Sequence, residues 1–101
     1  MFDYIKGEFA GKSATNKGVY AVVDACGVGY ILEILPRDYD LLPKEGEEVK
    51  LFSVLLHRED KMSLCGFLKR EDRDIFNVLT FVSGVGSKMA ITLLNAFKVS
   101  D

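Results

Sequence analysis

Residues 18–36 read GVYAVVDACGVGYILEILP, and this stretch decides the fold class. The short apolar run Val19–Val23 lies between a glycine and an aspartate, which is typical of a buried strand. A second strand is predicted over Tyr30–Leu35, where Pro36 stops it. Between the two strands, Gly27-Val28-Gly29 predicts a bulge or tight turn, because a Cβ there would obstruct the backbone. The stretch therefore indicates β-structure.

The rest of residues 1–67 continues this pattern. The side chains of residues 5–11 alternate in character, as in a strand with one solvent-exposed face. Val49–Leu56 predicts a long strand with Met62–Phe67 as its hairpin partner, and Asp38–Leu42 predicts a single helical turn. Five short strands with glycines at their corners suit a small closed barrel of the OB type better than an open sheet, whose edges would stay exposed. We therefore predict a mainly β fold with an OB-fold barrel over residues 1–67.

Residues 68–101 differ in composition and predict two helices. A charged junction at 69–74 comes first, with Glu71 and Asp72 in the first helical turn, where the helix dipole favours carboxylates. Residues 83–86 then break the helix, and a second helix begins near Ser87. Apolar residues recur at helical spacing in the first helix, at Ile75, Phe76, Leu79 and Val82. The second helix is amphipathic, with one face made of Ala90, Leu93, Leu94 and Phe97. Such a pair has little core of its own, so we expect a partial helix-hairpin-helix domain that further residues would complete.

Charge and composition narrow the function classes. The chain of 101 residues is 49% hydrophobic, which is enough for a packed core. Its net charge of −2 counts against a simple cationic DNA-binding domain, so any nucleic-acid binding must depend on local placement of charge. Cys26, Cys65 and His57 have no usual zinc-ligand spacing, and we predict no metal and no cofactor. Without a signal peptide or a membrane-spanning run, the sequence predicts a cytoplasmic location.

The stretch Ser83-Gly84-Val85-Gly86-Ser87-Lys88 is the first candidate site. Its glycines permit backbone conformations closed to other residues, and they leave the approach to the next helix clear of side chains. The N–H groups at a helix start form a ready anion site, to which Lys88 adds a full charge. A DNA phosphate fits this site, and contacts of this kind do not depend on base sequence. The residues alone leave a second interpretation open, in which the glycines only make a sharp turn between helices.

The stretch Leu56–Lys61 is the second candidate, with Glu59 and Asp60 expected at an exposed hairpin tip. On residue type alone, a solvated acidic turn is the favoured interpretation. A hydrolase with paired carboxylates has no third acid nearby to hold a metal, and His57 has no nucleophile to serve. Residues 27–30 do not open a helix, so a nucleotide-binding glycine loop is excluded by its context. We predict no catalytic residues.

Together these stretches resemble the RuvA family of Holliday-junction proteins. The match covers essentially the whole chain, and the joint order of the motifs is more specific than any one of them. The matching stretches are Met1–Gly7, Val23-Asp24, Gly27–Tyr30, Leu42-Pro43 with Gly46, Arg58-Glu59-Asp60, Leu64–Phe67, an acidic helix with Phe76, and Gly84–Ala90.

The resemblance implies sequence-independent binding of four-way DNA junctions, as the non-catalytic subunit of a branch-migration complex in recombination and repair. The family's OB-fold barrel helps to build a homotetramer that presents a flat surface to the junction. Carboxylates matching Glu59 and Asp60 form an acidic pin at its centre, and they would repel phosphates within a Debye length of about 8 Å. Helix-hairpin-helix motifs grip the duplex arms, and the residues that match the first of these are Ser83, Gly84, Gly86 and Lys88.

Three residues depart from the family pattern. Ser87 replaces the usual proline, Cys65 replaces an aromatic residue, and Asp3 replaces glycine and is expected to weaken a nearby phosphate contact. The family's second helix-hairpin-helix and its C-terminal domain, which engages the RuvB motor ATPase, are not in this sequence. We therefore expect DNA binding without recruitment of the motor.

Two other function classes remain open on the sequence. One is an oligomerisation core without useful DNA binding; charge reversal at Lys88 would weaken DNA binding under the leading hypothesis and change nothing under this one. The other is an unrelated OB-fold protein that binds single strands through aromatic platforms. The side chains available for that role are Phe9, Tyr20, Tyr30 and Phe52.

Overall fold

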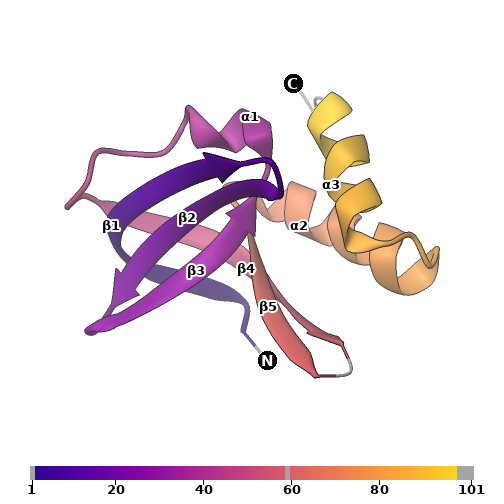
Figure 1. Cartoon of the computed structure of the whole chain (residues 1–101), viewed down its shortest axis with the longest axis horizontal. Helices are drawn as coiled ribbons and strands as arrows, with labels where there is room; N and C mark the ends of the chain where they lie inside the picture. The colour runs from indigo at the N-terminus through magenta and orange to yellow at the C-terminus, as the bar shows by residue number, and fades with distance from the viewer. Residues whose placement is uncertain (1, 59, 98–101) are drawn as a thin grey trace.

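The protein is described by a computed structural model, which covers residues 2–58 and 60–97. Its strands are β1 (Tyr4–Thr15), β2 (Gly18–Ala25), β3 (Val28–Ile34), β4 (Glu48–Arg58) and β5 (Lys61–Phe67). They form a closed barrel in the order β1-β2-β3-β5-β4, and β4 pairs with β1 to complete it (Figure 1). β3 and β5 are parallel, whereas the other neighbours are antiparallel. The predicted five-stranded OB-type barrel is confirmed.

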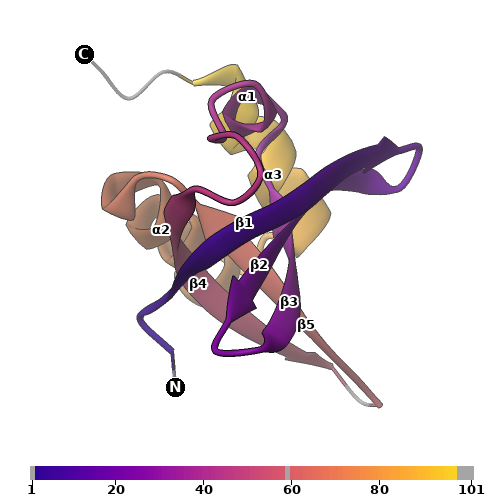
Figure 2. The same cartoon turned by 90° about the vertical axis from the view of Figure 1, so that its left-hand side faces the viewer.

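α2 (Arg70–Asn77) and α3 (Ser87–Ala96) lie beside the barrel, and α1 (Pro36–Tyr39) lies at its top (Figures 1 and 2). The short α1 connects β3 to β4, and α2 follows β5. α2 continues directly into the π-helical turn η1 (Val78–Val82), and α3 comes after a short connection. The single helical turn predicted over Asp38–Leu42 therefore begins earlier than expected. Pro36 can occupy a first helical position because an N–H at that position would have no partner within the helix.

The β2–β3 hairpin has a two-residue loop. Ala25 pairs with Val28, and both residues between them have positive φ, 55° at Cys26 and 85° at Gly27. Two positive φ angles are the pattern of a type I′ turn, whose twist matches that of the flanking strands. The predicted tight turn exists, but Val28 and Gly29 already belong to β3. The bulge lies elsewhere, in β1 between Phe9 and Gly11.

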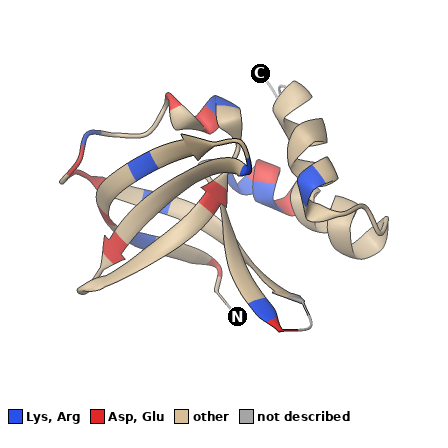
Figure 3. Cartoon of the chain, viewed as in Figure 1, with Lys and Arg blue, Asp and Glu red and all other residues tan. Residues whose placement is uncertain are grey.

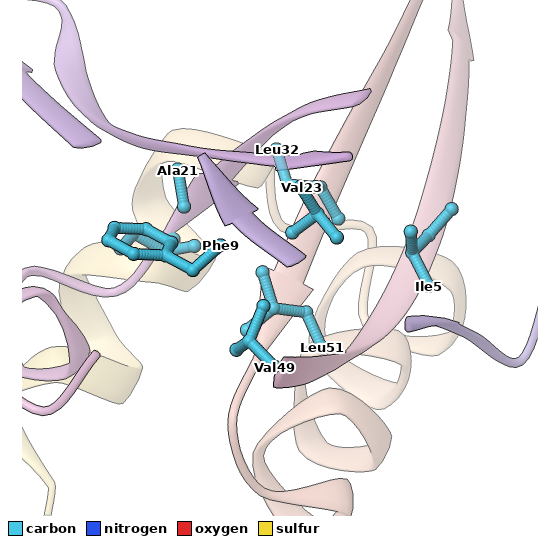
Figure 4. Packing of buried hydrophobic residues seen from close by; sticks show 8 residues of the cluster. Ile5, Phe9, Ala21, Val23, Leu32, Val49 and Leu51 are labelled. Carbon is cyan, nitrogen blue, oxygen red and sulfur yellow. The ribbon is translucent and has the colours of Figure 1, made fainter. Parts of the chain in front are cut away.

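The barrel interior holds the first of two hydrophobic clusters (Figure 4). Side chains along β1 alternate between the barrel interior and the solvent, and Ile5 and Phe9 point inward. On the same strand, a Cβ at Gly7 would collide with the carbonyl oxygen of Asp24, so glycine allows β1 and β2 to approach closely. The cluster consists of Ile5, Phe9, Ala21, Val23, Leu32, Ile34, Val49 and Leu51.

The second cluster joins the barrel to the helices. Phe67 at the end of β5 packs against Phe76 of α2, with their ring centroids 5.2 Å apart. The boundary predicted after residue 67 falls between these two phenylalanines, so one core crosses it; the division into two domains stays a prediction. The cluster consists of Leu35, Val54, Cys65, Phe67, Phe76, Ala90, Ile91 and Leu94.

The apolar residues at helical spacing divide into a buried and an exposed set. Phe76, Ala90 and Leu94 are buried, and Leu79 packs at the edge of the second cluster. Four others are exposed, namely Ile75, Val82, Leu93 and Phe97. The π-helical turn η1 has more residues per turn than an α-helix, so it rotates Val82 away from the stripe that contains Phe76. In α3, Ile91 is buried, whereas Leu93 is exposed.

The carboxyl group of Asp38 in α1 is almost completely buried, at 1% exposure. It accepts a hydrogen bond from the Leu68 N–H at 3.3 Å, where β5 leads into α2. Burial raises the pKa of Asp38 above its ordinary value of 3.8, although this hydrogen bond and the neighbouring Arg37 act in the opposite direction. The folded protein therefore holds a proton here at pH values where the unfolded chain has released it.

Asp38→Asn is expected to change the pH dependence of stability. A raised folded pKa makes the contribution of Asp38 most favourable at low pH, and this contribution declines as the pH rises from 3.8 through the folded pKa. Asparagine cannot lose a proton, so the stability of the variant relative to the parent should increase from about pH 3 to pH 7. Urea unfolding at several pH values measures this difference, with the exposed neighbour Asp40→Asn as control. A difference that stays flat, or that falls with pH, would contradict the prediction.

Candidate nucleic-acid interface

The glycine connection between η1 and α3 is an exposed hairpin. Gly84 has a left-handed φ of 73°, and Gly86 immediately precedes the first turn of α3. A Cβ at Gly86 would meet nothing within 4 Å, so the space before the helix start is open. The apolar Val85 faces the other way, packs against the second cluster, and donates its N–H to the Leu79 carbonyl at 2.8 Å. This anchor holds the predicted residues Ser83, Gly84 and Gly86 on the outside of the molecule.

Lys88 lies in the first turn of α3 but is already paired within the protein. Its Nζ donates to the Glu33 carboxylate at 2.7 Å and to the Lys17 carbonyl at 2.6 Å. The hydrogen bond to Glu33 raises the pKa of Lys88, so the ammonium stays charged. The Lys88 side chain is 62% exposed and that of Glu33 only 16%. The structure therefore brings Lys88 to the glycine hairpin together with a carboxylate.

Glu33 was not among the residues that the sequence indicated. It belongs to β3, 55 residues before Lys88, within a run that predicts a strand and nothing more. Both residues line a groove of about 390 Å³ between the paired strands β3 and β5 and the start of α3. Tyr20, Ile31 and Met62 also line this groove. The site at the glycine hairpin is thus built from the barrel as well as from the helices.

The β4–β5 hairpin carries the second candidate site. Its strands remain paired as far as Arg58 and Lys61, and it extends beyond the barrel away from α1 (Figure 1). Asp60 lies in the turn and is exposed. Glu59, the other predicted pin residue, lies outside the described residues. Within residues 2–58 and 60–97, no group of three or more His, Cys, Asp or Glu side chains could hold a metal ion.

Asp3, the residue expected to weaken a phosphate contact, forms ion pairs with two arginines of α2. Its carboxylate lies 3.1 Å from Arg73 and 3.4 Å from Arg70. Arg73 also pairs with Asp74 at 2.9 Å, and its side chain is 10% exposed. These cations are therefore balanced by neighbouring carboxylates. Figure 3 shows the same mixture elsewhere, with basic and acidic residues interspersed over barrel and helices.

The four aromatic side chains that the sequence offered for a single-strand binder are not freely presented. Phe9 is 3% exposed and belongs to the barrel core. Tyr20, Tyr30 and Phe52 are each half-buried. The Phe52 ring is further covered by the Arg70 guanidinium, 4.6 Å from its centroid. These four side chains therefore do not form an exposed platform for stacking unpaired bases.

The sequence model of the RuvA N-terminal domain family matches residues 1–66. The chain belongs to the RuvA family. The resemblance found in the motifs is thereby confirmed, and the barrel is the part of the chain that carries the family match.

Individual RuvA relatives extend the similarity over the helices. The chain is 40% identical, over its whole length, to a protein from Chlorobium phaeobacteroides (strain BS1). It is also 40% identical over 93% of its length to a protein from Sphingopyxis alaskensis, and 40% identical over its whole length to one from Gloeobacter violaceus. Each relative is described as a Holliday junction branch migration complex subunit RuvA. The chain covers 48%, 47% and 49% of these relatives, and so spans about half their length.

No helix in the described part of this RuvA-family chain is long and apolar enough to cross a membrane.

Proposed function

We propose that the chain binds four-way DNA junctions, in a structure-specific and sequence-independent way, as a non-catalytic part of a branch-migration complex. The observation that carries this proposal is the glycine hairpin of residues 83–88, which Val85 anchors and which presents an open helix start. The descriptions of the RuvA relatives support the same function.

The chemistry of the hairpin suits a phosphate. The first N–H groups of an α-helix have no partner within the helix, and the dipole of α3 favours negative charge at this end. Gly84 and Gly86 keep side chains out of the approach path, and Lys88 adds an ammonium group. Because a phosphate is the same in every nucleotide, contacts of this type position DNA without reading its sequence.

We assign Glu59 and Asp60 to an acidic pin that acts by repulsion. Carboxylates at the tip of the β4–β5 hairpin would repel phosphates within about 8 Å at physiological salt. Four such tips around the centre of a homotetramer would keep a junction open, while the glycine hairpins hold its arms. The exposure of Asp60 in the turn supports this assignment. In the complete branch-migration complex, strand movement would come from the separate RuvB motor ATPase.

A competition assay tests the proposal. The chain should prefer a labelled four-way junction over duplex DNA of equal length, and its affinity should fall steeply between about 50 and 200 mM salt. Combining Glu59→Lys with Asp60→Lys should reduce this preference. Lysines at the hairpin tip would attract the phosphates of duplex DNA as well as those of the junction, so the discrimination between the two would be lost. The matched control makes the same charge change in the exposed turn before β4, with Glu45→Lys and Glu47→Lys.

Equal affinity for duplex and junction would contradict the proposal. A chain that forms a discrete oligomer in solution and binds neither DNA would instead support the alternative, an oligomerisation core.

A further inference from the structure

The Glu33 carboxylate lies largely buried beside the glycine hairpin, next to Lys88. A Cβ on Gly18 would lie 2.7 Å from Glu33 Oε2 and 3.3 Å from the Tyr20 hydroxyl, so glycine at residue 18 leaves room for the carboxylate in this position. At 16% exposure, the Glu33 side chain has little contact with water. It forms an ion pair with the Lys88 ammonium at 2.7 Å.

This contact uses part of the binding capacity of Lys88. A lysine ammonium has three hydrogens to donate. One points to Glu33 and one to the Lys17 carbonyl, both within the same chain. A phosphate approaching the start of α3 thus meets a cation that already has a carboxylate beside it.

We infer that Glu33 competes with DNA phosphate for Lys88 and thereby sets the affinity of the glycine hairpin. The inference rests on the proposed function. If Lys88 turns to the phosphate, Glu33 loses its partner in a position where water replaces it poorly. If Lys88 stays paired, the Glu33 charge remains beside the incoming phosphate and repels it. In both cases the carboxylate weakens binding.

Glu33→Gln tests the effect of the negative charge at residue 33 while keeping the size and shape of the side chain. Glutamine keeps an oxygen that can accept from Lys88, but it removes the negative charge. Affinity for a four-way junction should rise by up to about fivefold per hairpin, the change that corresponds to an exposed ion pair. The dependence of log affinity on log salt should steepen by about 0.9 per hairpin, because Lys88 then contributes a full phosphate neutralisation.

Three variants control this experiment. Glu48→Gln removes the same charge from an exposed pair with Lys6 on the barrel and should change neither affinity nor salt slope. Lys88→Gln should weaken binding, and adding Glu33→Gln to it should produce a smaller gain than in the parent. Thermal unfolding of each variant confirms that the fold is kept.

A second measurement does not need DNA. Titration with inorganic phosphate, followed by the amide NMR signals of Gly86 and Lys88, should show tighter binding for Glu33→Gln than for the parent. The inference is overturned if Glu33→Gln and Glu48→Gln behave alike in both assays, or if the gain from Glu33→Gln is as large without Lys88 as with it. Failure of every variant to bind junction DNA, with phosphate still bound more tightly by Glu33→Gln, would overturn the proposed function and keep the competition between Glu33 and phosphate.

Discussion

Replacing Phe76 with alanine is expected to lower the free energy of unfolding by about 3–5 kcal/mol. The Phe76 side chain is 0% exposed, and its ring packs on Phe67, the last residue of β5. The substitution removes transfer free energy and leaves a cavity, and both effects destabilise the folded state. Because this cavity would open where the barrel meets the helices, α2 and α3 would lose part of their attachment to the barrel.

Urea unfolding followed by circular dichroism measures the loss. Phe81→Ala is the matched control, because it makes the same chemical change in η1 at a side chain that is 66% exposed. Surface changes of this kind usually shift stability by less than about 0.5 kcal/mol. Equal effects of the two substitutions would show that the second cluster does not support the fold as described.

Replacing Arg37 with alanine is expected to cost about 3–5 kcal/mol, the usual effect of removing one partner from a buried ion pair. Arg37 donates two hydrogen bonds to the Asp72 carboxylate, each 3.2 Å long, and a third to the Leu94 carbonyl at 3.1 Å. Asp72 is 0% exposed, so the substitution leaves its charge in the interior without this partner. Arg37 thereby connects α1 to both α2 and α3, together with a backbone N–H that donates to Asn95 at 2.8 Å.

The pair variant Arg37→Met with Asp72→Leu tests the cause of this loss. Replacing both charges by apolar side chains of similar volume should recover much of the stability, because no unpaired charge remains. Arg70→Ala is the exposed comparison: it breaks the surface pair with Asp3 and should cost about 1 kcal/mol or less. A cost for Arg37→Ala no larger than that of Arg70→Ala would contradict the interpretation of Arg37 as the connection between the helices.

Asp72 illustrates the limit of reasoning from sequence. Its place in the first turn of a helix predicted a favourable interaction with the helix dipole, and the structure does place it there. Its burial and its partner Arg37 had no signal in the sequence, since the two residues are 35 positions apart. The same holds for Glu33 and Lys88. Lys88 was recognised because its neighbours form a known motif, whereas Glu33 lies in a strand that suggested no function.

Local patterns allowed the sequence by itself to determine the barrel, the β4–β5 hairpin with Asp60 in its turn, and the glycine break between two helices. Strand alternation, turn glycines and helix starts depend on neighbouring residues, so they can be recognised along the chain. Only the tertiary structure decided which helical faces are buried, how Arg37 holds the helices, and that Lys88 has a carboxylate as its partner. These contacts join residues far apart in the sequence, and their energies depend on burial and distance, which exist only once the chain has folded.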